Sequence, residues 1–281
     1  MFHINTRVNG KLHTPKTKKD FTKIQADLQK FLNQSVDVIS QVDSYNDINK
    51  YTIEFLSFNW LITVASVVGL IFLVILFGRK ISESKKLVYA KFLSIIMIVF
   101  FLTNHIFLFY LGKWELSKEL PIHLCSISGL ICCFILFIPT KFRQFLFEFL
   151  FYCGIIGGIQ AILTPLLDDY GGYNYFYVQF FFKHAMIIAF PIILRNEIGM
   201  KLTKFSWLKT FFALNVLLLM FIPLNSYLGS NYMYLNSPPA VDNPLVIGGW
   251  PTYLYWWELF VLILILIFYL FGKPKNFESK I

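Results

Sequence analysis

One cysteine and one histidine, far apart along the chain, are the residues best suited to chemistry in this sequence. Cys125 and His184 both fall inside predicted membrane spans, at depths that differ by about 5 Å when a helix rises 1.5 Å per residue. A thiolate is a nucleophile, and an imidazole can take the thiol proton and later return it to a leaving group. The pair predicts catalysis through a Cys125 thioester, with His184 as general base and His105 as its substitute.

Further polar side chains lie at similar depths in the predicted spans and in a neighbouring loop. Polar groups in hydrocarbon are costly, so those that occur usually face a cavity or a partner helix. We expect them to line one polar chamber that opens toward the extracytoplasmic side. The predicted lining is His123, His105, Asn104, Gln160, Thr164, Lys183, Asn231, Tyr234 and Glu258.

Two competing interpretations apply to the same residues. Cys125 and His184 also suit inert helix packing, as buried cysteines often do. A metal or haem site using both of them with His105 and His123 is the least favoured interpretation. His123 and Cys125 are two positions apart, about 200° around a helix, which predicts opposite faces. We expect no metal and no cofactor.

The composition of the chain requires a membrane around these residues. Apolar residues make up 57% of the 281 residues, charged residues only 15%, and the mean hydropathy is +0.61. A soluble domain carries about a quarter charged residues, so a water-soluble globule is excluded. A spanning helix needs about 20 apolar residues. An all-α polytopic fold, a seven-helix transmembrane bundle, is predicted, with spans at about 56–78, 87–112, 119–139, 144–165, 174–194, 205–228 and 252–272.

Lysine and arginine predict the orientation, because these residues gather in cytoplasmic loops. With the N-terminus outside, basic clusters at 79–86, 141–143 and 195–204 lie inside, whereas the outer connections hold only Lys113 and Lys118. We therefore predict an N-out, C-in protein of the cell membrane. The same pattern accounts for the net charge of +9, so no nucleic-acid partner is expected.

Three parts of the chain follow from this topology. Residues 1–54 form a polar N-terminal tail, 55–272 the seven-span domain, and 273–281 a short basic cytoplasmic tail. Within the first part, 21–40 carry apolar residues at roughly helical spacing. This spacing predicts an amphipathic helix that lies on a membrane surface or packs on the outer loops of the protein.

Four motifs occur in order along the spans. The first is Leu120-Pro121-Ile122-His123-Leu124-Cys125, and the others are Gly157-Gly158-Ile159-Gln160-Ala161-Ile162-Leu163-Thr164-Pro165, a Phe-rich stretch ending at His184, and Asn231-Tyr232-Met233-Tyr234-Leu235 followed by Trp250-Pro251. Together they resemble the bacterial YwaF-like integral membrane proteins, over about 55–272. The chain has Ser126 where many members of that family carry an acidic residue, so no role of that acid is carried over.

The resemblance implies an activity. The YwaF-like family is similar to eukaryotic multi-spanning acyltransferases that make polyunsaturated ether phospholipids, and more distantly to membrane hydrolases of fatty-acid esters. A cysteine that carries the acyl group and an assisting histidine would then fall on Cys125 and His184. Membrane lipids, a phospholipid or lysophospholipid, would be the partners. The alternative is a non-catalytic transporter or ligand-binding protein, in which Lys183 and Glu258 form an ion pair or clamp a solute.

Overall fold

The computed structural model describes residues 6–8, 11–13, 23, 25–27, 29–30, 53–167, 174–239 and 246–274. The chain divides into two units, Met1–Lys50 and Tyr51–Ile281. In the first unit, strands β1 (Thr6–Val8) and β2 (Lys11–His13) pair as an antiparallel hairpin. The described residues between 23 and 30 are helical. The rest of the amphipathic helix predicted over 21–40 lies outside the described residues.

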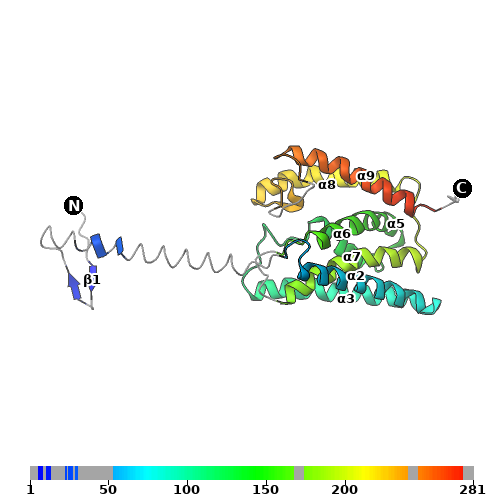
Figure 1. The fold of residues 1–281 in the computed structure, drawn as a ribbon, viewed down its shortest axis with the longest axis horizontal. Helices are drawn as coiled ribbons and strands as arrows, with labels where there is room; N and C mark the ends of the chain where they lie inside the picture. Colours follow the sequence, from blue (N-terminus) through cyan, green and yellow to red (C-terminus); the bar gives the residue numbers. More distant parts are fainter. Residues whose placement is uncertain are drawn as a thin grey trace. The chain divides into compact units, whose positions relative to one another are not determined.

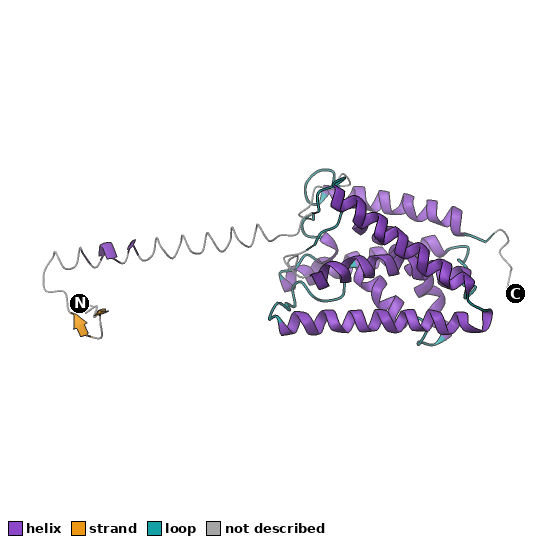
Figure 2. Cartoon of the chain, turned by 60° about the horizontal axis from the view of Figure 1, so that its bottom comes forward, coloured by secondary structure: helices purple, strands orange, loops and turns teal. Residues whose placement is uncertain are grey.

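The second unit is a bundle of α-helices (Figures 1 and 2). Among the described residues, six helices are long and apolar enough to cross a membrane, which confirms the prediction of an all-α polytopic fold. They are α2 (Phe58–Lys80), α3 (Glu83–Tyr110), the continuous run of α5 (Thr140–Phe149), η1 (Leu150–Gly154) and α6 (Ile155–Leu163), α7 (Asn174–Asn196), α8 (Ser206–Leu228) and α9 (Thr252–Gly272).

The third predicted span is shorter than expected. Within 119–139 the chain forms an 11-residue helix, α4 (Leu124–Phe134), which rises about 16 Å and does not alone cross about 30 Å of hydrocarbon. Pro121 and Pro139 disfavour helical backbone in Leu120 and Ile138, so one continuous helix over 119–139 is not expected. Turns at 135–137 lead on toward α5. The predicted seven-helix bundle therefore consists of six long helices and one short one.

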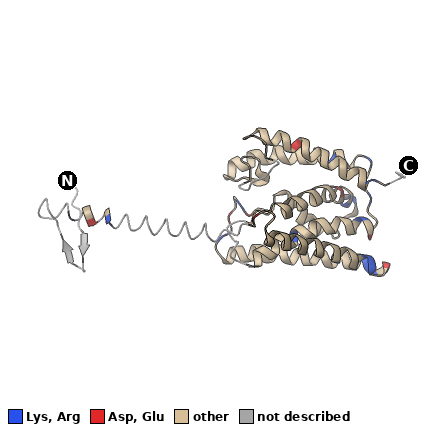
Figure 3. Ribbon diagram, viewed as in Figure 1, with Lys and Arg blue, Asp and Glu red and all other residues tan. Residues whose placement is uncertain are grey.

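The helices differ in which surroundings they face. The α5–α6 run and α7 lie inside the bundle, whereas few residues of α2, α8 and α9 are buried and each of these helices exposes large apolar side chains. Figure 3 shows that long stretches of the helices carry no charged residue. An apolar exterior of this kind is what a helix bundle dissolved in lipid requires.

Ion pairs join the helix ends that are predicted to face the cytoplasm. Glu197, at the end of α7, pairs with Lys86 of α3 at 2.7 Å and with Arg79 of α2 at 4.0 Å. Glu148 of α5 is fully buried and pairs with Lys209 of α8. These contacts hold one end of the bundle together and leave the opposite end to the cavity described next.

Candidate functional site

A cavity of about 790 Å³ lies among α3, α4, α6, α7 and α9 and reaches the loops at one end of the bundle. Nine of the eleven predicted site residues line it. Asn231 and Glu258 do not. The polar lining comprises Asn104, His105, Lys118, Glu119, His123, Cys125, Ser126, Gln160, Thr164, Gln179, Lys183, His184 and Tyr234.

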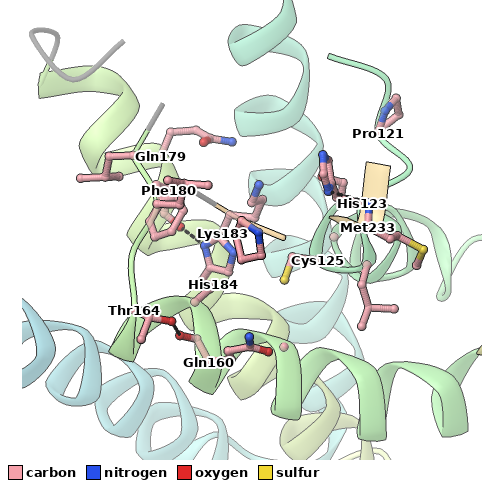
Figure 4. Close-up of a pocket in the computed structure, with 18 of the residues that line it drawn as sticks. Pro121, His123, Cys125, Gln160, Thr164, Gln179, Phe180, Lys183, His184 and Met233 are labelled. Carbon is pink, nitrogen blue, oxygen red and sulfur yellow. Dashed lines mark hydrogen bonds between the residues drawn. The ribbon is translucent and has the colours of Figure 1, made fainter. Parts of the chain in front are cut away.

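Cys125 lies in the first turn of α4, and its thiol points into the cavity (Figure 4). Gly157 of α6 makes room for it, since a Cβ at that position would lie only 3.2 Å from Cys125 Sγ. The first backbone N–H groups of a helix have no partner within the helix, and the helix dipole is positive there. Negative charge that develops beside Cys125 is therefore stabilised by the start of α4.

His184 lies on α7, where its backbone packs closely on α6. A Cβ at Gly158 would lie 3.1 Å from the carbonyl oxygen of His184, so the glycine permits the approach. His184 Nδ1 lies 2.6 Å from the carbonyl oxygen of Phe180. A carbonyl oxygen only accepts, so Nδ1 donates, and Nε2 of the neutral ring is left as an unprotonated acceptor. This is the tautomer that a general base needs.

The thiol and this imidazole face the same space (Figure 4). No direct hydrogen bond between Cys125 and His184 occurs among the described residues. Proton transfer between the two side chains would therefore require a bridging substrate group or a small shift of either side chain. Catalytic hydrogen bonds are often long before substrate binds.

His105 and His123 are held in the opposite tautomer. Trp114 Nε1 donates to His105 Nδ1 at 3.1 Å, and the backbone N–H of Met233 donates to His123 Nδ1 at 3.2 Å. A neutral ring whose Nδ1 accepts carries its proton on Nε2. Both rings thus present a donor, which makes His105 a poor substitute for His184 as the base.

The argument that placed His123 and Cys125 on opposite helix faces is wrong. His123 is the N-cap of α4, with extended backbone at φ −64° and ψ 150°, so helical spacing does not apply to it. Both residues line the cavity. Among the described residues, no group of three or more His, Cys, Asp and Glu side chains is arranged to hold a metal ion.

Lys183 is the cation at the centre of this polar group. It lies close enough to act electrostatically on His105, His123, Cys125 and His184. Gln160 also faces the cavity, and its side-chain amide has no hydrogen-bond partner among the described residues. The cavity therefore brings together a thiol, an imidazole with an accepting nitrogen and several groups able to stabilise negative charge.

Glu258 is oriented away from this group. Its carboxylate accepts a hydrogen bond from Asn215 Nδ2 at 3.1 Å, which joins α9 to α8. Glu258 is thus paired with Asn215 rather than with Lys183. Within the part of the chain that the structure describes, no ion pair joins Glu258 to Lys183, the first of the two arrangements suggested under the transporter alternative.

The family model that matches this chain is that of the TMEM164 family, over residues 54–269. The chain belongs to the TMEM164 family. The match runs from just before α2 nearly to the end of α9 and so includes every helix that lines the cavity. No curated protein and no solved structure matches the chain. Family membership and six long apolar helices make it a multi-pass membrane protein.

In this TMEM164-family chain, the sequence reasoning missed two residues that shape the cavity mouth. Tyr232, fully buried in the loop after α8, donates to the carbonyl oxygen of Leu116 at 2.6 Å and accepts from the N–H of Leu120 at 3.0 Å. Asn225, also fully buried, bonds both backbone groups of Tyr232, at 2.8 and 2.9 Å. The two residues fix the loop that presents the N–H of Met233 to His123.

Asn231 belongs to the same loop rather than to the chamber lining. Its Oδ1 accepts from the N–H groups of Asn236 and Ser237, at 3.0 and 3.1 Å, and its amide donates to the Ser237 carbonyl oxygen at 2.9 Å. Asn231 therefore closes the turn over 231–237. An asparagine followed by aromatic residues and then prolines was the signal for such a turn.

Proposed function

We propose that this TMEM164-family protein is a membrane-embedded acyl-transfer enzyme, a lipid acyltransferase or ester hydrolase, that works through a thioester on Cys125. The main observation in support is the hydrogen bond from His184 Nδ1 to the Phe180 carbonyl, which leaves Nε2 as an acceptor. His184 and Cys125 line the same cavity. The resemblance to cysteine-dependent phospholipid acyltransferases points to the same two residues.

The first half-reaction forms the thioester. His184 Nε2 takes the thiol proton, and the Cys125 sulfur attacks the carbonyl carbon of an acyl ester. The C–S bond forms as the ester C–O bond breaks, and the imidazolium returns the proton to the departing alkoxide. The lysolipid alcohol leaves, and the acyl group stays on the protein.

The second half-reaction releases the acyl group. A hydroxyl group, either of a lysophospholipid or of water, attacks the thioester while His184 Nε2 takes its proton. The new C–O bond forms, the C–S bond breaks, and the imidazolium reprotonates the sulfur. The acceptor decides whether the net reaction is acyl transfer or hydrolysis.

Negative charge on the carbonyl oxygen develops in both steps. The Lys183 ammonium, the Nε2–H of His123 and the backbone N–H groups that open α4 are the donors available to it. Preorganised donors of this kind supply much of the rate acceleration in acyl transfer.

Acyl-enzyme trapping tests the proposal. Membranes carrying the protein are incubated with an alkyne-tagged lipid acyl donor, and the label on the protein is measured before and after neutral hydroxylamine, which cleaves thioesters. We expect a hydroxylamine-sensitive label that is lost in Cys125→Ala and Cys125→Ser and kept in Cys153→Ala, a control at a buried cysteine outside the cavity. Unchanged labelling of Cys125→Ala would overturn the proposal.

We also propose that the protein lies in the cell membrane with its N-terminus outside. The basic clusters at 79–86 and 195–204 support this orientation, since they meet at the end of the bundle where Glu197 pairs with Lys86. A reporter active only in the cytoplasm, fused after residue 281, is expected to be active. An inactive C-terminal fusion, with the same reporter active at the N-terminus, would reverse the orientation.

A further inference from the structure

The cavity has a second, apolar part that the acyl-transfer chemistry does not use. One face of α9 lines it at the spacing of a single helical stripe. The opposite wall comes from α3, α4 and α6. We call this space the α9 trench, with the stripe Trp257, Phe260, Val261, Leu264 and Phe268 on one side and Met97, Gly129, Cys133, Ile156 and Gly157 on the other.

The α9 trench has the depth of one lipid leaflet. Trp257 and Phe268 are eleven positions apart on a continuous helix, a rise of about 16 Å. The hydrocarbon core of a bilayer is about 30 Å thick, so the trench spans roughly half of it. The first turns of α9 lie beside the loop 231–237 at the cavity mouth, because the Tyr253 hydroxyl donates to the Tyr234 carbonyl. Phe268 is therefore at the deep end.

The deep end is closed by packing. A Cβ at Gly272, one turn beyond Phe268, would lie 2.8 Å from Leu202 Cδ1 and 2.9 Å from Phe151 Cζ. No space for a ligand remains between α9 and its neighbours there. Phe268 forms the floor of the trench.

The outer face of α9 is exposed beside the trench. Phe260 lines the cavity and is still 40% exposed. Figure 1 shows α8 and α9 side by side as a layer of their own. The exposed face of α9 carries Leu259, Ile263 and Leu270, which suit contact with lipid. On the helix Phe260 lies at the edge between this exposed face and the stripe that lines the trench, and a chain from the surrounding membrane would enter there.

We infer that the α9 trench binds one acyl chain of a membrane lipid, with the ester at the Cys125 end and the methyl end against Phe268. Lipid tails are as apolar as leucine side chains, so moving a tail from membrane to trench gains little free energy. Shape therefore decides which chains are accepted. Phe268 sets the longest chain, because a methylene that does not fit costs roughly tenfold or more in selectivity.

Binding is tested apart from catalysis. Purified Cys125→Ala protein in nanodiscs receives a phosphatidylcholine with a diazirine at the methyl end of one chain, and crosslinked peptides are mapped by mass spectrometry. We expect adducts at 264–268 that fall at least fivefold in Leu264→Trp, which fills the trench. The matched control Ile263→Trp places the same side chain on the exposed face with Leu259 and Leu270 and is expected to leave them unchanged. Equal crosslinking in both variants would overturn the inference.

Chain selection is tested in the protein with Cys125 intact, and it rests on the proposed function. Acyl donors of increasing length are compared by thioester yield, and Phe268→Ala is expected to move the optimum to chains longer by about two to four carbons. An unchanged optimum of chain length would show that Phe268 does not set the longest chain accepted. If Cys125 forms no thioester with any donor while the diazirine adducts remain, the proposed reaction fails and the lipid site stands.

Discussion

Replacing His184 with asparagine separates two roles of this residue, the hydrogen bond to the Phe180 carbonyl and the proposed action as general base. In His184→Asn the side-chain amide can still donate to the Phe180 carbonyl, as Nδ1 does at 2.6 Å, but asparagine has no basic nitrogen to replace His184 Nε2. A typical hydrogen bond contributes about 0.5–1.5 kcal/mol, and this one is retained, so the melting temperature is expected to stay close to that of the parent. Loss of a general base lowers rates by about 10²–10⁴, which is about 2.7–5.4 kcal/mol in the barrier.

The assay measures the rate of Cys125 thioester formation from the alkyne-tagged donor by gel fluorescence. The melting temperature of the same protein in detergent is measured in parallel. Without the base, only the thiol that has already ionised reacts, so the residual rate should rise about tenfold per pH unit on the acid side of thiol titration. Added imidazole is expected to restore part of the rate in His184→Gly. A His184→Asn protein that is as stable as the parent and forms the thioester at the parental rate would refute the assignment of His184 as base.

Substitutions of His123, Tyr232 and Gly158, with Gly69→Ala as a control for the last, test the surroundings of the pair. His123→Asn keeps an acceptor for the Met233 N–H but loses the Nε2 donor, so thioester formation should slow about 10²–10³-fold while the stability is unchanged. His123→Gln should retain a higher rate of thioester formation and be less stable. Equal rates in the two variants would contradict a donor role of His123. Tyr232→Phe removes two hydrogen bonds and should lower the free energy of unfolding by about 1–3 kcal/mol. Because burial raises the pKa of Tyr232, this penalty should be constant below pH of about 10 and shrink above it, as followed by thermal melts. Gly158→Ala places a Cβ 2.6 Å from Ile188 Cγ1 and should cost about 1–3 kcal/mol, while Gly69→Ala, with nothing within 4 Å, should cost nothing.

The long helices follow from local composition, which is why hydropathy predicts them. A window of 20 residues records how apolar a segment is, and for α2 or α9 that decides the structure. The window does not record what Pro121 and Pro139 do to the backbone before them, so it overestimates α4. The same oversight put His123 inside a helix, although it is the N-cap.

Partners across the bundle were the harder part to predict. Glu258 and Lys183 were plausible partners by depth, yet Asn215 on the adjacent helix is the neighbour of Glu258, because α8 and α9 pack against each other. The tautomers of the three histidines likewise depend on Trp114, Met233 and Phe180. Such contacts are set by tertiary packing, which spacing along one chain does not reveal.

The shortness of α4 explains why the proposed reaction would take place inside the bundle. A span of full length would begin at the membrane surface, and its unpaired N–H groups would face water. Instead α4 begins at Leu124, inside the cavity. Irregular backbone at membrane depth is tolerated only where protein or a cavity surrounds it, and here the irregular segment 119–123 lies against Tyr232 and the cavity. In the proposed reaction, the helix start, with Cys125 in its first turn, would meet substrate within the bundle, where its dipole acts more strongly on developing charge than it would in bulk water.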